Sequence, residues 1–105
     1  MEAQKARFMV GQIISHKLFN YRGVIVDVDP CFMGSEEWYR DMALTRPPRN
    51  HPWYRVLVHD ASHVTYVAER NLRANDSTEP VDHPLLDAYF ENFRDGQYIS
   101  YTRAN

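Results

Sequence analysis

Five histidines are the side chains best suited to bind a metal or to move a proton: His16, His51, His59, His63 and His83. Metal binding and general-base catalysis both need histidines that converge with one another or with carboxylates. The sequence contains no H-E-x-x-H motif, and His59 and His63 flank a short polar turn instead of sharing a helix. The spacing therefore predicts no metal site and no histidine base.

Two acids and a cysteine come next in chemical interest. Asp27 and Asp29 lie two residues apart in an extended segment, so they share one face of a strand. Paired carboxylates perform acid–base chemistry across a substrate cleft, whereas a row of acids on one strand is typical of its solvent side. A thiol is activated by a neighbouring histidine or by the N-terminus of a helix. Cys31 has neither beside it in the sequence. We therefore predict no catalytic residue, no cofactor and no enzymatic activity.

Aromatic rings interleaved with arginines favour a binding surface instead. Bases stack on such rings, and arginines hold phosphates or read guanine edges. Tyr21 and Arg22 fall in a turn, and Tyr54 and Arg55 fall in an extended segment, so these four are candidate contacts with DNA or a protein partner. Packing inside a small core is the alternative for any ring, and it explains two others better: Trp53 and Tyr66.

A second basic element runs from Arg46 to His51, as Arg46-Pro-Pro-Arg49-Asn-His51. Proline fixes φ and restricts the preceding residue, so this segment must be extended. Arg46 and Arg49 are therefore candidates to reach a phosphate backbone or an acidic protein partner, and a solvated linker is the alternative. Ten of the twelve cationic residues are arginine, a bias that suits a binding surface but that GC-rich coding also produces.

The chain has 105 residues, a net charge of −2, 44% hydrophobic residues and one cysteine. This length allows one small domain and excludes a Rossmann fold or a TIM barrel. Residues 1–73 carry ten cationic against eight anionic residues, whereas residues 74–105 carry two against six. The short apolar runs predict no membrane span, and the polar start from Met1 to Arg7 and the single cysteine favour a cytoplasmic protein.

The sequence predicts short strands over residues 12–16, 23–29, 53–59 and 64–68. In the second of these, Val24, Val26 and Val28 alternate with Ile25 and the two acids. Residues 60–63 suit a hairpin connection, and Glu69 to Leu72 suits a single helical turn before a weakly indicated fifth strand. Between the second and third strands, Ser35 before two glutamates predicts a short helix over about residues 36–43.

The last third of the chain predicts an amphipathic helix over about residues 83–95, after a polar linker at 74–82. Apolar residues recur there at three- and four-residue spacing, and Gly96 is placed to end the helix. Leu86, Phe90 and Phe93 form its apolar stripe, which would pack either on the protein's own core or on another subunit of a homo-oligomer.

Short antiparallel strands, tight turns and one helical turn before a last strand predict a small SH3-like barrel over about residues 8–80. The whole chain, residues 1–105, would then be a single mainly β domain of about five strands, with a short helix in an insertion and a helix at the end.

Three blocks of the sequence resemble the bacterial HspQ family, also called YccV-like or hemimethylated-DNA-binding domains. The first joins Phe8-x-Val10-Gly11-Gln12 to Tyr21-Arg22-Gly23 and the Asp27-Val28-Asp29-Pro30 run. The second is Pro52-Trp53-Tyr54-Arg55, and the third is Thr65-Tyr66-Val67-Ala68-Glu69-x2-Leu72. The blocks keep their order and spacing, and the resemblance covers roughly residues 8–73.

The resemblance implies an SH3-like barrel in a small cytosolic protein that is often an oligomer, and it implies two functions. One is binding of hemimethylated duplex DNA near the replication origin, with effects on replication-initiator levels. The other is a heat-shock, or stress-response, role in protein degradation, through modulation of the ATP-dependent protease Lon and its substrates. A pI of about 6.2 is low for a duplex binder, so both functions stay open.

Overall fold

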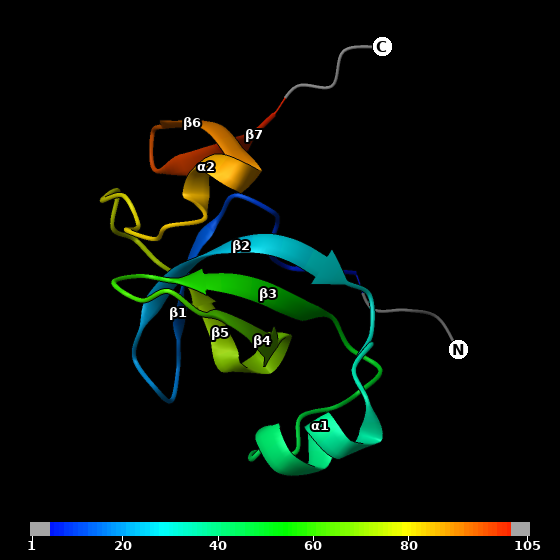
Figure 1. Cartoon of the computed structure of the whole chain (residues 1–105). Coiled ribbons are helices and arrows are strands. Elements are labelled where there is room, and N and C mark those ends of the chain that lie inside the picture. Colours follow the sequence, from blue (N-terminus) through cyan, green and yellow to red (C-terminus); the bar gives the residue numbers. More distant parts are fainter. Residues whose placement is uncertain (1–4, 102–105) are drawn as a thin grey trace.

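The computed structural model of the chain describes residues 5–101, so part of the polar N-terminal stretch and Arg103 lie outside it. Figure 1 shows a central sheet with a small C-terminal unit at one end and a helical insertion at the other. In chain order the elements are β1 (Ile13–His16), β2 (Arg22–Asp29), α1 (Glu36–Met42), β3 (Trp53–Val58), β4 (Val64–Ala68), the 3-10 helix η1 (Glu69–Asn71), β5 (Leu72–Ala74), α2 (Leu86–Tyr89), β6 (Phe90–Arg94) and β7 (Gln97–Ser100).

The central sheet is antiparallel, with strand order β4-β3-β2-β1-β5. The prediction of a mainly β protein with five antiparallel strands is confirmed, and so is the weakly indicated β5. Among residues 5–101, β4 and β5 do not pair with each other, so both are edge strands and no closed ring of hydrogen bonds forms. The SH3-like barrel stays a prediction.

A β-bulge at Val26 breaks the simple alternation expected in β2. Ile25 pairs with Val56 and Asp27 pairs with Arg55, so two steps along β2 match one step along β3. The bulge changes which side chains of β2 face each side of the sheet. Val24 and Val26 pack on one face, whereas Val28 packs on the other. The prediction that all three valines share a face is therefore wrong.

Both faces of the sheet are covered, because neighbouring residues of its strands join different cores. Ile14, Ile25 and Val56 belong to the core on one face, together with Tyr54 and Leu72. Their immediate neighbours Ile13, Val24 and Leu57 belong to a second core on the other face. Burial on both sides explains why β2 and β3 contain continuous apolar runs where a half-exposed strand would alternate.

The insertion between β2 and β3 forms α1 and an aromatic cluster. The Ser35 hydroxyl accepts a hydrogen bond from the Trp38 N–H at 3.0 Å, which confirms the predicted N-cap. Trp53 is 1% exposed at the centre of the cluster, and half-buried rings surround it: Phe32, Trp38, Tyr39 and Tyr66. The prediction that Trp53 and Tyr66 serve packing is confirmed for Trp53, and Tyr66 lies at the edge of the same cluster.

The predicted helix over residues 83–95 is wrong. Helix α2 is four residues long, and a β-hairpin of β6 and β7 follows it. The hairpin turn is Asp95-Gly96, both with positive φ (54° and 77°), which matches the backbone of a tight two-residue turn. The three apolar residues of the expected stripe pack on the chain's own second core, with Phe90 buried and Leu86 and Phe93 half-buried.

Backbone contacts near the start of β1 join this C-terminal unit to the sheet, in addition to its packing on the second core. The Tyr98 N–H donates to the Gly11 carbonyl at 2.9 Å, and a β-bridge links Gln12 to Gln97. The Tyr98 hydroxyl also accepts from the Val81 N–H at 2.8 Å and donates to the Val81 carbonyl at 3.1 Å. The linker and the hairpin therefore cover the second core together. None of the helices within residues 5–101 has the length and apolar character needed to cross a membrane.

Candidate functional site

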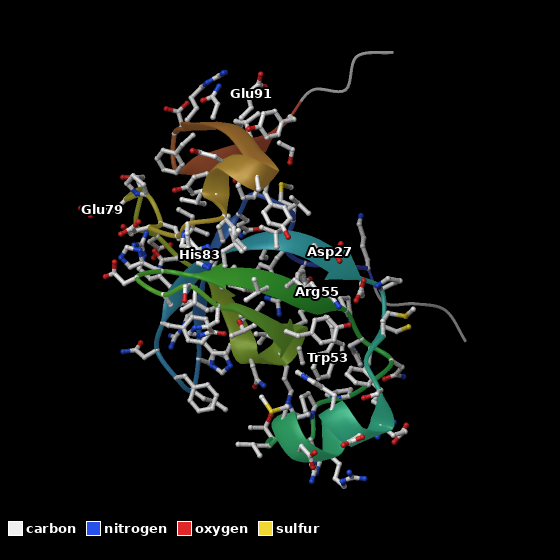
Figure 2. The ribbon with its side chains drawn as sticks, in the orientation of Figure 1. Asp27, Trp53, Arg55, Glu79, His83 and Glu91 are labelled. Carbon is white, nitrogen blue, oxygen red and sulfur yellow. The ribbon has the colours of Figure 1, made fainter. Side chains whose placement is uncertain are left out.

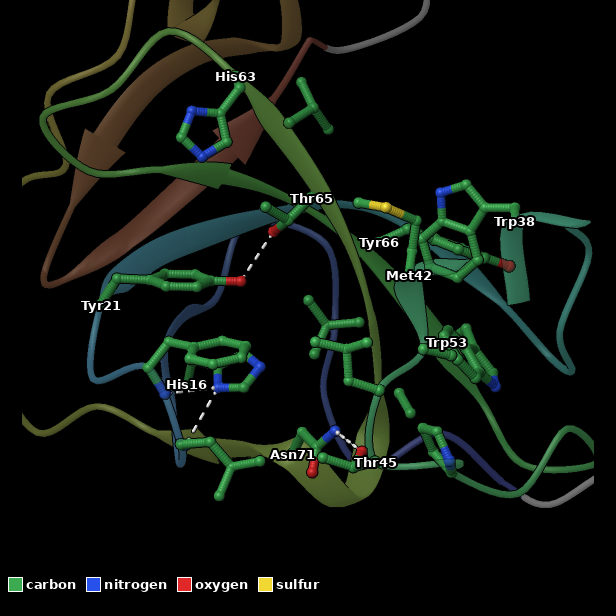
Figure 3. Close-up of a pocket in the computed structure, with 18 residues that line it drawn as sticks. His16, Tyr21, Trp38, Met42, Thr45, Trp53, His63, Thr65, Tyr66 and Asn71 are labelled. Carbon is green, nitrogen blue, oxygen red and sulfur yellow. Dashed lines mark hydrogen bonds between the residues drawn. The ribbon is translucent and has the colours of Figure 1, made fainter. Parts of the chain in front are cut away.

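A groove of about 350 Å³ lies along β4, and we call it the β4 groove. Figure 3 shows β4 crossing it, with the β1–β2 turn on one side and the insertion on the other. Its lining includes no aspartate, glutamate, lysine or arginine. The lining residues are His16, Leu18, Phe19, Tyr21, Trp38, Met42, Ala43, Leu44, Thr45, Pro47, Trp53, His63, Asn71 and residues 64–68 of β4.

The first wall is the turn between β1 and β2, and His16 shapes it. The His16 Nδ1 atom accepts hydrogen bonds from the N–H groups of Leu18 and Phe19, both at 3.1 Å. Burial lowers the pKa of His16, which keeps Nδ1 free of a proton and able to accept. The turn holds Leu18 and Phe19 outward, with exposed fractions of 56% and 65%. The turn therefore places two exposed apolar side chains at the rim of the groove.

The floor of the groove is fixed by hydroxyl and amide pairs. The hydroxyls of Tyr21 and Thr65 lie 2.8 Å apart in a hydrogen bond, and burial raises the pKa of Tyr21. At the other end, Asn71 Nδ2 donates to Thr45 Oγ1 at 3.1 Å. Both pairs are drawn in Figure 3. They satisfy the polar groups of the floor within the protein, so what the groove offers a ligand is mainly apolar surface.

The second wall belongs to the insertion, and two arginines hold it. Arg46 Nη1 donates to the carbonyls of Tyr39, Arg40 and Ala43, the last turn of α1 and its C-cap. Arg70 Nη2 donates to the Thr45 carbonyl at 2.5 Å. Cations at a helix C-terminus complement the helix dipole. Arg46 therefore has a structural role, because it anchors the end of α1. The anchored segment exposes Met42 and Leu44 along the groove.

Arg55 lies on the open part of the sheet between the two covering units. Its Nη1 atom is 3.3 Å from Asp27 Oδ2 and 3.9 Å from Asp29 Oδ2, and its guanidinium stacks 4.8 Å from the Tyr66 ring. Figure 2 shows Asp27 and Arg55 next to each other. The Tyr66 hydroxyl donates to Asp29 at 2.6 Å; burial and this bond raise the pKa of Tyr66. The two acids share a face, as predicted, and they neutralise a cation.

Arg22 and Arg49 also have partners inside the protein. Arg22 Nη2 donates to the Glu79 carbonyl at 2.5 Å, which ties the start of β2 to the linker. Arg49 forms a bidentate ion pair with Glu36, and its guanidinium carbon lies 3.9 Å from the centre of the Tyr39 ring. The bond to Arg49 lowers the pKa of Glu36. The structure does not gather the predicted arginines on one surface, and each would have to exchange a partner to bind phosphate.

Tyr54 lies in the core with no exposed surface, so its ring cannot stack on a ligand. It points into the first core because its neighbours Trp53 and Arg55 take the opposite face of β3. The prediction of Tyr54 as a contact residue is corrected on this ground. Tyr21 is half-buried and lines the β4 groove, where part of its ring is accessible.

Three exposed cations that the sequence patterns did not single out lie on neighbouring backbone segments: Lys17, Arg70 and Arg73. The Lys17 N–H donates to the Asn71 carbonyl, and Arg73 pairs with Ser15 across β1 and β5. Within residues 5–101 none of the three has a carboxylate partner. Their grouping depends on the pairing of β1 with β5, which lie far apart in the sequence, so no local motif indicates it. We call them the β5 basic cluster.

The antiparallel sheet and its uncharged edge groove define a small β-sheet domain suited to binding. No group of three or more His, Cys, Asp or Glu residues within the described range could hold a metal ion. The chain belongs to the YccV-like family, described as "Hemimethylated DNA-binding protein YccV like", whose sequence model matches residues 6–97. This confirms the resemblance found in the sequence.

Curated relatives carry the same domain within much longer chains. F-box only protein 21 of Homo sapiens and of Pongo abelii are each 37% identical to this chain over 94 residues, and the Mus musculus protein is 36% identical. The match covers 88% of this chain but 15% of each relative. The chain therefore corresponds to one part of those proteins.

Proposed function

We propose that the chain is a non-enzymatic DNA-binding protein that recognises hemimethylated duplex DNA and thereby affects replication-initiator levels. The observation that carries this proposal is the family match, which spans residues 6–97 and names that ligand. Phosphate neutralisation dominates duplex affinity, so the contacts should be cations without internal partners. Lys17 and Arg73 of the β5 basic cluster fit this requirement best. Arg70 would first release the Thr45 carbonyl, and Arg22, Arg46, Arg49 and Arg55 would likewise contribute after exchanging a partner.

Fluorescence anisotropy with unmethylated, hemimethylated and fully methylated duplexes of one sequence tests the proposal. We expect the tightest binding to the hemimethylated duplex, with a logarithmic salt slope that falls by about one for each phosphate contact removed. Lys17→Gln, Arg70→Gln and Arg73→Gln should each weaken binding. Arg40→Gln is the matched control, because Arg40 is exposed but pairs with Asp41. Equal affinity for all three duplexes at low salt would overturn hemimethylated recognition.

A second candidate is a heat-shock protein-interaction factor that modulates degradation by the Lon protease. The uncharged β4 groove favours it, since apolar surface binds proteins better than it binds phosphates. Degradation of a substrate by purified Lon and ATP should change rate when the folded chain is added, and an equal amount of lysozyme should leave it unchanged. Unchanged turnover over a wide range of chain concentration would reject this candidate. Light scattering on the purified chain tests whether it forms the predicted homo-oligomer.

A further inference from the structure

We propose that the β4 groove binds an extended segment of a partner protein by adding it as a strand to the edge of β4. The segment would be apolar in its centre and would carry carboxylates at the end that meets Lys17 and Arg70. This inference deepens the protein-binding candidate and rests on it. It does not require DNA recognition, although Lys17 and Arg70 are also proposed phosphate contacts. The argument has three parts: the free edge of β4, the apolar walls, and the charges at one end.

The edge of β4 leaves backbone groups without a strand partner. The Glu69 N–H donates to the Pro52 carbonyl, and the register continues without a break to Val64 opposite Leu57. In an antiparallel pair every second residue bonds to the neighbouring strand, so the N–H and C=O groups of Val64 and Tyr66 point away from β3. Within residues 5–101 no strand pairs with this edge. An edge of this kind is a template for an added strand.

The walls beside this edge are apolar and unusually exposed. Phe19 and Leu18 lie on one side with exposed fractions above one half, and Met42 (62%) and Leu44 (73%) lie on the other. Successive side chains of an added strand would point alternately toward one wall and toward the other. The groove's volume of about 350 Å³ is near the lower end for ligand sites, which suits a few side chains of a peptide.

The charges around the groove select the ends of the segment. Lys17 stands between two lining residues, His16 and Leu18, and Arg70 contacts the carbonyl of a third, Thr45. Both cations are at the Asn71 end, because the Lys17 N–H bonds to the Asn71 carbonyl. The nearest acid in the sequence, Glu69, is buried and bonded to Tyr54. A carboxylate on the partner would therefore meet uncompensated positive charge at this end.

A fluorescein-labelled nonapeptide with Val, Leu and Phe at alternate positions and two aspartates at one end is the probe. Two versions of the peptide are made, one with the aspartates at the N-terminal end and one with them at the C-terminal end. Fluorescence polarisation reports the binding of each version to the full chain. Replacing the aspartates by lysines should weaken binding at least tenfold. Placing prolines at alternate positions should abolish it, because proline cannot donate to a strand ladder.

Matched variants locate the peptide. Met42→Gln should weaken peptide binding at least fivefold, whereas Met9→Gln should change it less than twofold, because Met9 is equally exposed (61%) but lies outside the groove. Lys17→Glu should weaken it at least fivefold, with Lys5→Glu as the matched control. Circular dichroism confirms that each variant is folded, so a loss of binding reports the groove.

Four outcomes overturn the proposal. The first is no binding of either peptide, and the second is equal effects of Met42→Gln and Met9→Gln. The third is a dimer in light scattering that Met42→Gln dissociates, which would make a second copy the occupant. The fourth is loss of duplex binding in Met42→Gln, which would make the groove a DNA site. If the peptide fails while hemimethylated preference or the effect on Lon persists, only the groove proposal falls.

Discussion

The Tyr54 hydroxyl donates a hydrogen bond of 2.6 Å to Oε1 of Glu69, and both side chains are buried. The same carboxylate oxygen accepts from the Arg7 N–H at 2.8 Å, and the Phe8 N–H donates to the Tyr54 hydroxyl at 3.3 Å. Three segments of the chain therefore meet at one carboxylate: the N-terminal segment, β3 and η1. This network explains why an aromatic residue with a polar tip stands in the core.

Tyr54→Phe should lower the free energy of unfolding by about 1–3 kcal/mol, because it leaves a buried carboxylate with one donor fewer. Urea unfolding measures the change. Tyr101→Phe is the control, since the Tyr101 hydroxyl bonds to a carbonyl at the exposed surface. Duplex and peptide affinities of folded Tyr54→Phe should equal those of the parent chain. A specific loss of binding without a loss of stability would contradict the placement of Tyr54 in the core.

The stability of the β1–β2 turn should depend on pH through His16. Burial lowers the pKa of His16 in the folded chain, so the unfolded chain binds more protons below its own pKa of about 6.5. Stability is then fully present above that pH and declines as the pH falls through it toward the lower folded pKa. A proton on Nδ1 would also remove the acceptor for the Leu18 and Phe19 N–H groups.

His16→Asn isolates this effect, because the asparagine side-chain oxygen can accept from the same backbone groups without titrating. Urea unfolding of both chains between pH 7.5 and pH 4.5 should show a steeper loss of stability in the parent than in the variant. His59 and His83 also accept backbone N–H groups through Nδ1, and they are present in both chains. Identical pH profiles would show that His16 does not carry the effect.

The strands of the central sheet could be predicted from sequence because local signals mark them. Ser35 before two glutamates marked α1, and apolar segments bounded by turn residues marked β3, β4 and the hairpin between them. The C-terminal region carried a misleading signal, since apolar spacing of three and four also arises when a short helix runs into a strand. Asp95-Gly96 between alternating residues is a hairpin signal, and it identifies β6 and β7 better than the apolar stripe does.

The candidate site was harder to predict from the sequence than the strands were, for a physical reason. Arginine content indicates capacity to bind phosphate, but the partners of Arg22, Arg49 and Arg55 come from distant parts of the chain or from a neighbouring strand. The β4 groove combines the β1–β2 turn, the insertion and an edge strand, and only the fold brings these together. The Val26 bulge, which sets the faces of β2, has no local signature such as glycine.

Gly11 and Gly96 both have positive φ, yet substitutions at them should differ in cost. A Cβ atom at Gly11 would lie 2.1 Å from the Tyr98 carbonyl oxygen, at the contact that joins the C-terminal unit to the sheet. Gly11→Ala should therefore cost about 3 kcal/mol or more, from backbone strain and overpacking together. Gly96→Ala meets only ordinary contacts with Thr78 and should cost about 1 kcal/mol.

Urea unfolding with intrinsic fluorescence measures both glycine variants. If Gly11→Ala does not fold, proteolysis and circular dichroism of the two variants at low temperature keep the comparison, with Gly96→Ala folded and protected. Equal costs for the two variants would contradict the close approach of β7 to Gly11.

Arg55→Gln tests whether an exposed cation with an internal partner contributes less to duplex affinity than one without such a partner. Arg55 is exposed, pairs with Asp27 and Asp29, and stacks on Tyr66. Exposed ion pairs contribute about 0–1 kcal/mol, so the variant should lose little stability. Because its charge is already compensated, its removal should also reduce duplex affinity and the salt slope less than Arg73→Gln does. Anisotropy titrations of both variants at several salt concentrations make the comparison. A larger effect for Arg55→Gln would place the phosphate contacts on the open face of the sheet between α1 and the C-terminal unit.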